Sequence, residues 1–405
     1  TLWEKWIISQ YGSVRQAEKL WGISVPRDGD GNLTGPSDAM LNNAGMNPMI
    51  CAYYRFLDDI VAKEFNEFRQ YLLSVDSNHL LSFRMQNAGS AVNPSEGNYD
   101  FQSLASVMDF MSPEGYSIAS GDDSMIQLMF MAAYARYCKP NAPILMKEFC
   151  ANVASGSTFD PKNNSVAIEK AAYLEQFMKF LYQSDFSAFY LWWYPSGLRA
   201  AEKNDCGLFD LDGSDRLTTA VLREWIPKFT EREERTRECV VIEIERDDTG
   251  LGIKGMFNKV KDQLLAAYRD GKNVVFVNHR QTDASEPVYA DEVLNEAVGG
   301  TKTSGSYPLR YVNGQIKKVE IYRKNGLRYA KITVCNTGHA TWRAGTVALT
   351  TTDDSDVRIT PSAIEEDVGY LEEVEVTVLL QRMGDLELRF VIDGMEFGMC
   401  YEATL

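Results

Sequence analysis

The segment 143-PILMKEF-149 carries more information about the fold than any other part of this chain. It is a short apolar run that ends near Glu148, as in a buried β-strand whose last polar residue emerges from the sheet. A second strand-like run, 186-FSAFYLWWYPSG-197, follows it and ends in Trp192 and Trp193. Parallel barrels place their chemistry at the carboxyl ends of strands. A carboxylate and paired indoles at two such ends predict a site for a neutral, polyhydroxylated ligand.

Strand-like and helical patterns alternate through the first 230 residues. The expected strands are 79–84, the end of 101–111, 143–149 and 186–193, and the expected helices are 2–22 with a break at Tyr11-Gly12, 51–75, 101–111, 123–138, 165–183 and 215–229. Such alternation implies a parallel sheet with helical crossovers. Four units of this kind make half of a barrel that takes about 250 residues when whole. We therefore expect an α/β fold in which residues 1–230 form the second half of a (β/α)8 TIM barrel, with the first half upstream of Thr1.

The pattern changes after this half-barrel. A charge run, 231-EREERTRE-238, predicts a solvated linker. Residues 236–304 are expected to form a small α/β domain, with a strand at 239–247, a helix at 255–271, a strand at 273–279 and a helix at 287–298. Residues 305–405 contain short alternating runs between turn signals, which predict an antiparallel β-sandwich. Trp342 is expected in its core, with a carbohydrate-binding face as the alternative. Its expected strands are 316–323, 328–336, 345–351, 371–380, 386–393 and 395–403.

Composition excludes several classes of partner. Apolar residues make up 45% and charged residues 24%, which is ordinary for a globular protein. The net charge of −16 argues against nucleic acid or an anionic membrane surface as a partner. No stretch approaches the roughly 20 apolar residues of a membrane span, so none is expected.

Cysteine and histidine usage narrows the chemistry further. The seven cysteines are scattered, odd in number and without a CxxC or Cys/His cluster, so we expect neither a disulfide framework nor a zinc site. The three histidines lie far apart, which leaves carboxylates to move protons. The chemistry expected here needs no organic cofactor and no metal.

Four segments, in order, resemble the C-terminal half of a clan A (β/α)8 glycoside hydrolase, the large clan that includes β-galactosidases, mannanases and cellulases. They are 2-LWEKWIISQYGSVRQAEKLWG-22, 109-DFMSPEGY-116, 143-PILMKEF-149 and 189-FYLWWYPSGLRAAEKNDCGLFDLDGSDR-216. Separately, 333-TVCNTGHATWRAGTVAL-349 resembles an accessory immunoglobulin-like sandwich. The resemblance implies a retaining hydrolase of β-linked glycans with Glu148 as the nucleophile. It also implies an acid/base Glu, usually preceded by Asn, on a strand upstream of Thr1. The pairs Asn66-Glu67 and Asn295-Glu296 fall in expected helices and do not fit that role.

Each candidate site residue has a structural alternative. Glu148 could instead form a structural ion pair, for example with Lys147. Tyr116 is expected to orient the nucleophile, or simply to pack. Side chains alternate along a strand, so only one of Trp192 and Trp193 should face a sugar, and we favour Trp192. The possible sugar-hydroxyl ligands, each equally readable as a solvated loop residue, are Arg84, Asn87, Glu114, Arg199, Glu202, Asn204 and Asp205.

A second function stays open at this point. A noncatalytic carbohydrate-binding or adhesion protein on a glycosidase-like scaffold would also explain the absent acid/base. The expected partner is in both cases a carbohydrate, with a missing N-terminal segment or a second chain completing the barrel. The strand–helix–strand unit and the sandwich could also support a homo-oligomer. An accessory sandwich slightly favours a secreted or cell-surface location over the cytoplasm, although the scattered cysteines point the other way.

Overall fold

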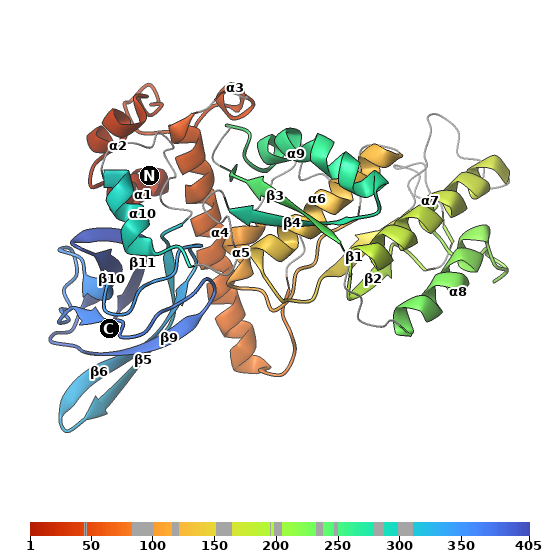
Figure 1. The fold of residues 1–405 in the computed structure, drawn as a ribbon. Coiled ribbons are helices and arrows are strands. Elements are labelled where there is room, and N and C mark those ends of the chain that lie inside the picture. The colour runs from red at the N-terminus through yellow and green to blue at the C-terminus, as the bar shows by residue number, and fades with distance from the viewer. Residues whose placement is uncertain are drawn as a thin grey trace. The chain divides into compact units, whose positions relative to one another are not determined.

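The computed structural model describes most of the chain, coloured in Figure 1. The described residues are 1–43, 45, 47–82, 100–115, 121–150, 164–194, 196–197, 205–231, 238–246, 250–278, 287–298 and 311–405. They form two compact units. Unit 1 comprises Thr1–Asn78, Glu245–Met256 and Asn278–Leu405, and unit 2 comprises His79–Ile244 and Phe257–Val277.

Unit 1 opens with helices where the sequence predicts them. They are α1 (Leu2–Tyr11), α2 (Val14–Trp21) and α4 (Pro48–Val75). The short α3 (Asp38–Leu41) lies in a stretch that was not predicted to be helical. Thr1 and Glu4 form a capping box that starts α1. Gly12 and Gly22 end α1 and α2 in the left-handed conformation that glycine adopts without strain. The indole rings of Trp3 in α1 and Trp21 in α2 are buried and stack on each other, which joins the apolar faces of these two helices.

The C-terminal part of unit 1 consists of two antiparallel sheets that share one core. The first has the order β5-β6-β9 and the second β11-β10-β7-β8. The strands are β5 (Gly314–Lys324), β6 (Leu327–Asn336), β7 (Val347–Thr351), β8 (Ser362–Ala363), β9 (Glu373–Leu379), β10 (Asp385–Ile392) and β11 (Met395–Thr404). Trp342 is fully buried against Phe390 and Phe397. All six strands predicted for 305–405 are confirmed. The structure adds β8, which was not predicted because a strand of two residues shows no alternating pattern in the sequence.

The N-terminal helices pack on these sheets within unit 1. Arg389 of β10 is buried and donates from Nη2 to the carbonyl oxygen of Ser9 at 2.9 Å. The amide of Gln10 donates to the carbonyl of Gly398, and that of Asn66 to the carbonyl of Lys317. α10 (Ala290–Val298) also contributes side chains to the core of the sheets. The contacts therefore group residues 1–78 with the C-terminal sheets, whereas the division into domains 1–230, 236–304 and 305–405 stays a prediction.

Unit 2 alternates strands with helices, as predicted. Its elements are α5 (Phe101–Ala105), α6 (Asp122–Cys138), β1 (Leu145–Phe149), α7 (Asn164–Gln183), β2 (Ala188–Leu191), α8 (Leu217–Thr230), β3 (Cys239–Ile244), most of α9 (Gly252–Arg269) and β4 (Asn273–Asn278). β1 and β2 pair in parallel, and β3 pairs with β4 across the predicted strand–helix–strand unit. No helix among the described residues has the length and hydropathy that crossing a membrane requires.

Four strand-like segments of unit 2 lie side by side in chain order. Met111 and Glu114 form parallel bridges with Ile144 and Glu148, which adds residues 109–114 to the edge of β1. Next to them, the backbone N–H of Asp109 donates to the carbonyl of Leu81 at 2.8 Å. The described part of the predicted strand 79–84 thus lies in the expected place, although it forms no regular ladder. Successive crossover helices place parallel strands side by side in chain order. The segments at Leu81, at 109–114, β1 and β2 follow that order.

Candidate active site

Glu148 lies near the carboxyl end of β1, beside two other candidate residues. The N–H of Gly115 donates to the carbonyl of Glu148 at 2.7 Å, and the backbones of Glu114 and Glu148 form a parallel β-bridge. On the other side of β1, the N–H of Trp192 donates to the carbonyl of Phe149 at 2.8 Å. Glu114 is 1% exposed, whereas Glu148 is half-buried. Glu114, Glu148 and Trp192 therefore lie together at the carboxyl ends of three adjacent strand-like segments.

Close packing fixes this end of β1. The ring of Phe149 stacks on Phe177 of α7 with centroids 3.6 Å apart. Gly115 sits against the same pair, because a Cβ added there would come within 2.8 Å of Phe149 and Phe177 and within 2.9 Å of Met146. A glycine is therefore required at 115, and Glu148 is held by a strand that cannot shift easily.

The two tryptophans stand at the end of β2. Trp192 and Trp193 are both half-buried, and their rings meet edge to face with centroids 5.7 Å apart. The peptide bond between them is cis. Tyr194, which follows, is exposed and packs on Phe209 at 5.4 Å. The indoles are thus presented beside the strand end that carries Glu148.

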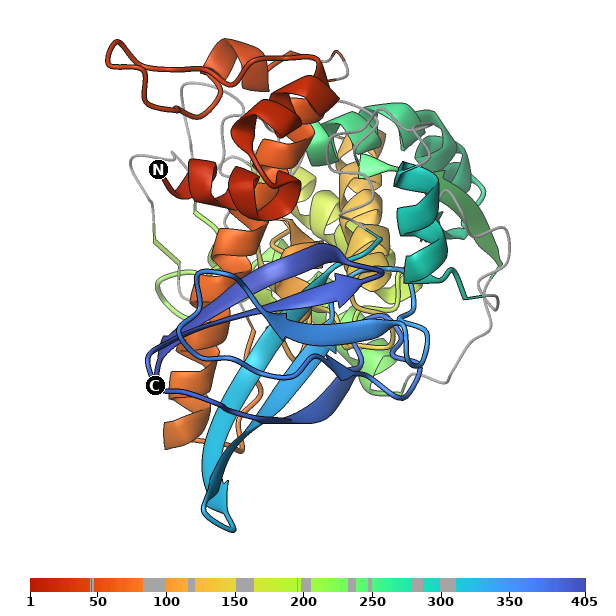
Figure 2. The same cartoon turned by 90° about the vertical axis from the view of Figure 1, so that its left-hand side faces the viewer.

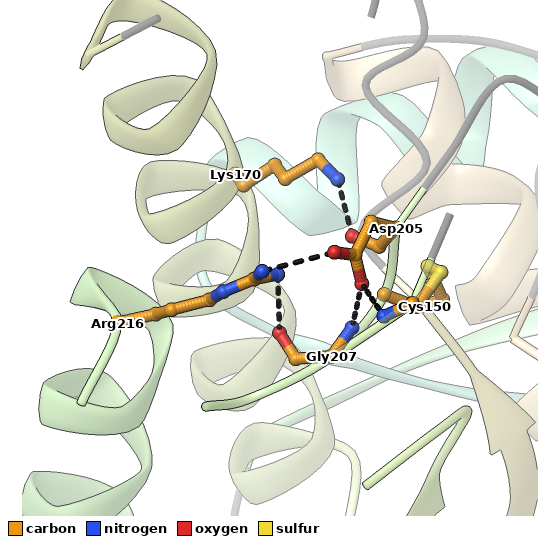
Figure 3. The surroundings of a disulfide bond; sticks show 7 residues. Cys150, Lys170, Asp205, Gly207 and Arg216 are labelled. Carbon is orange, nitrogen blue, oxygen red and sulfur yellow. Dashed lines mark hydrogen bonds and ion pairs between the residues drawn. A yellow bond between two sulfur atoms is a disulfide. The ribbon is translucent and has the colours of Figure 1, made fainter. Parts of the chain in front are cut away.

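A buried carboxylate organises the loop that follows the tryptophans. Asp205 is only 5% exposed and accepts hydrogen bonds from the N–H groups of Gly197 and Gly207 at 3.1 and 2.9 Å. Arg216, at the N-terminus of α8, donates to its other oxygen at 2.9 Å (Figure 3). Lys170 of α7 donates to the backbone carbonyl of Asp205 at 2.7 Å. We call the group formed by Asp205, Lys170, Arg216 and the Cys150–Cys206 disulfide the loop clamp.

A disulfide joins this loop to the end of β1, and corrects the expectation that the cysteines stay unpaired. Cys150 follows β1 directly and is bonded to Cys206, with Cα atoms 5.7 Å apart, an ordinary separation for a disulfide. The prediction was wrong because an odd count and wide spacing in sequence say nothing about proximity in space. The available signal was positional, since Cys150 directly follows β1 and Cys206 lies on the loop after the adjacent strand β2.

Burial and charge shift the titration of the loop clamp. Burial alone would raise the pKa of Asp205, but the hydrogen bonds from Arg216, Gly207 and Gly197 outweigh it and hold that pKa below its ordinary value. Burial lowers the pKa of Lys170 to about 8, and the nearby charge of Asp205 offsets this only in part. The clamp therefore stays anionic at Asp205 over the whole neutral range.

Several predicted ligands lie outside the described residues, and their roles stay predictions. They are Arg84, Asn87, Tyr116, Arg199, Glu202 and Asn204. In the chain, Tyr116 follows Glu114 by two residues, and Arg199 and Glu202 fall between the clamped positions Gly197 and Asp205. Sequence reasoning missed Lys170, Arg216 and the cysteine pair, since nothing local marks a helix residue as the partner of a distant loop. Within the described part of the chain, no group of three or more His, Cys, Asp or Glu side chains could hold a metal ion.

Comparisons with known proteins find similar solved structures at low identity. No protein-family profile and no curated protein sequence matches the chain. A GH5_18 structure from Bifidobacterium longum subsp. infantis is 15% identical, with 54% of this chain and 55% of that chain covered and a TM-score of 0.41. A polyextremophilic β-galactosidase from Halorubrum lacusprofundi is 12% identical, with 94% and 75% covered and a TM-score of 0.48. An exo-carrageenase of GH42 from Bacteroides ovatus is 10% identical, with 94% and 62% covered and a TM-score of 0.39.

These structures are glycoside hydrolases of the class that the sequence resembles. This chain spans about half the length of the GH5_18 structures it matches, covering 55% and 52% of two of them.

Proposed function

We propose that this chain carries the C-terminal half of the catalytic barrel of a retaining glycoside hydrolase that acts on β-linked glycans. The observation that carries the proposal is the shared edge of Glu114, Glu148 and Trp192 on three adjacent strands. A half-buried carboxylate on a rigid strand end suits nucleophilic attack on a sugar. An indole beside it suits stacking on the C–H face of the same ring.

In this proposal Glu148 attacks the anomeric carbon and forms a glycosyl ester as the glycosidic bond breaks. A second carboxyl group protonates the leaving oxygen, and then activates the water that cleaves the ester with net retention. Retention requires the two carboxyl groups to stand about 5–5.5 Å apart. We assign the second group to a strand upstream of Thr1 or to a second chain, which would also complete the barrel. The reaction proposed draws on no metal and no organic cofactor.

The other site residues take supporting roles in the proposal. Trp192 forms the sugar platform, and Trp193 packs edge to face against it. Glu114 and Tyr116 bind a hydroxyl group and orient Glu148. The loop clamp holds Gly197 and Asp205, and Arg199 and Glu202, which fall between them in the sequence, are proposed to bind hydroxyl groups of the same sugar. The C-terminal sheets would be an accessory immunoglobulin-like module.

The disulfide bears on where the protein works. Disulfides persist mainly in oxidising compartments such as the cell exterior and the periplasm. The Cys150–Cys206 bond therefore favours a secreted or cell-surface enzyme over a cytoplasmic one.

Replacement of Glu148 in the natural full-length protein tests the proposal. We expect Glu148→Ala to lower turnover of β-linked aryl glycosides at least about a thousandfold, as loss of a covalent nucleophile does. Added azide should restore turnover in that variant by replacing the carboxylate as nucleophile. The control is Glu169→Ala, which removes an exposed glutamate from α7 and should leave turnover unchanged. Wild-type turnover in Glu148→Ala would remove the nucleophile assignment, and glycan binding without hydrolysis in the wild type would favour the noncatalytic alternative.

A further inference from the structure

The hairpin of β5 and β6 ends in a tip that leaves the sheet. The strands are joined by Asn325 and Gly326, whose φ angles of 52° and 80° fit the two-residue turn that joins twisted strands tightly. The ladder between β6 and β9 ends at Tyr329, and one further backbone hydrogen bond, from the N–H of Leu380 to the carbonyl of Arg328 at 2.9 Å, follows it toward the tip. Figures 1 and 2 both show this tip extending past the other strands of the sheets.

The tip carries cations that nothing in the described chain neutralises. Arg323 and Arg328 are direct partners across the hairpin, and like charges placed directly opposite each other are destabilising. Lys324 follows at the turn. Among the described residues, no carboxylate pairs with any of these three side chains. Further down the same hairpin the lysines are paired, Lys318 with Glu320 at 2.8 Å and Lys331 with Glu375 at 2.7 Å.

Two stacked aromatic rings, one exposed and one half-buried, lie on the other face of the same tip. Tyr322 is 40% exposed and stacks on its cross-strand partner Tyr329, with centroids 5.6 Å apart and planes 20° apart. Because side chains alternate along a strand, these rings share their face with Lys324, opposite to Arg323 and Arg328. Leu327 adds exposed apolar surface beside the rings. The tip therefore offers flat rings and the Lys324 charge on one face, and the charges of Arg323 and Arg328 on the other.

The charge of the hairpin contrasts with that of the chain. Residues Gly314–Asn336 contain six Lys or Arg and a single Glu, whereas the whole chain carries a net charge of −16. An extended anionic surface would be repelled by the rest of such a protein. A single anionic strand that touches only the projecting tip would feel mainly the local cations, since charges are screened within about 8 Å at physiological salt.

We propose that the tip of the β5–β6 hairpin binds an anionic polysaccharide, a glycan that bears carboxylate or sulfate groups. On one face of the tip the Tyr322–Tyr329 stack would cover the C–H face of a sugar ring while Lys324 pairs with an acid group. Arg323 and Arg328 would pair with further acid groups where the same glycan crosses to the opposite face. Binding would relieve the repulsion between the two facing arginines. The inference stands apart from the proposed hydrolysis, because the tip uses no residue of the candidate active site.

Calorimetric titration of the full chain with polygalacturonate, heparin and neutral dextran tests this. We expect binding to at least one polyanion, no binding to dextran, and loss of affinity with added salt. The double variant Arg323→Ser/Arg328→Ser should weaken binding at least tenfold, and Tyr322→Ala should weaken it severalfold. The matched control Arg15→Ser/Lys19→Ser removes the same charge from the exposed face of α2 and should bind like the wild type. Glu148→Gln should also bind like the wild type, which separates this inference from the catalytic one.

Several results would overturn the inference. They are absence of binding to both polyanions, equal losses in the tip and control variants, and undiminished binding by the tip variant. Two further results would replace it with another partner. Tip-dependent dimerisation in sedimentation velocity without polysaccharide would identify a second copy of the chain as the occupant. Tip-dependent binding to phosphatidylserine vesicles, without binding to either polyanion, would identify a membrane surface. Unchanged circular dichroism and melting temperature in each variant would show that the fold is intact.

Discussion

Asp205 and Arg216 form an ion pair at 2.9 Å that joins the loop after β2 to the N-terminus of α8. The carboxylate is almost fully buried, and its second oxygen accepts two backbone N–H groups of the same loop. This arrangement satisfies every hydrogen-bonding demand of a buried charge, which would otherwise be costly. Asp205 therefore ties together the described parts of the loop that follows the tryptophans.

Removing the charge of Asp205 should loosen this loop. We expect Asp205→Asn to lower the free energy of unfolding by about 1–3 kcal/mol, because Arg216 keeps its charge while losing its buried partner. Chemical denaturation would measure the loss. Asp215→Asn is the matched control, since it breaks the exposed pair with Arg223 and should cost under about 1 kcal/mol. Equal losses in the two variants would contradict a central role for Asp205.

Lys170 should make stability depend on pH in the alkaline range. Its pKa is about 8 in the folded protein and 10.5 without burial, so between these values the unfolded chain binds more protons. Stability should therefore rise as the pH increases from about 8 towards 10.5. Lys170→Met should abolish this contribution, whereas Lys179→Met, at an exposed position of the same helix, should keep the wild-type profile. Parallel profiles of wild type and Lys170→Met would refute the assignment.

The Cys150–Cys206 bond should stabilise the protein and leave five thiols to titrate. The five cysteines outside this disulfide are Cys51, Cys138, Cys239, Cys335 and Cys400. Reduction or Cys206→Ser should cost about 2–4 kcal/mol, because the bond restrains a long loop in the unfolded chain. Cys239→Ser, which removes an exposed thiol outside the disulfide, should melt like the wild type. Titration of the unreduced, unfolded protein with a thiol reagent would reveal seven thiols if the disulfide does not form.

Gly115 should tolerate no side chain. A methyl group there would overlap Phe149 and Phe177, which hold the end of β1. We expect Gly115→Ala to cost about 1–3 kcal/mol by overpacking and to impair the site through displacement of Glu148. Gly29→Ala is the control, because nothing lies within 4 Å of a Cβ at that position. Thermal melts of both variants would show a selective loss at 115, and equal melting temperatures would contradict the packing account.

Local patterns predicted most of the secondary structure. Helical periodicity located α4, α6 and α7, and two-residue alternation located the six long strands of the C-terminal sheets. The order of 109–114, β1 and β2 also follows from sequence, because crossover helices leave few arrangements. The packing of α1 and α4 on the C-terminal sheets could not be predicted from the sequence. No local pattern in residues 1–78 indicates contact with a segment some 300 residues away in the chain.

The candidate site, too, was predicted only in part from the sequence. Glu148, Glu114 and Trp192 were predicted because each ends a strand, and the structure brings them to one edge. The loop clamp depends on contacts between the loop, α7 and α8. Asp205 was a candidate sugar ligand in sequence, but its buried hydrogen bonds make it a structural anchor instead.

Covalent trapping tests the central claim most directly. The full-length protein would be incubated with a 2-deoxy-2-fluoro β-glycoside of a sugar it hydrolyses, digested and analysed by mass spectrometry. A retaining enzyme with Glu148 as nucleophile should accumulate one glycosyl ester, on the peptide that contains residues 143–149, and lose activity in step with labelling. An adduct on another carboxylate, or turnover with inversion and no adduct, would contradict the assignment of Glu148.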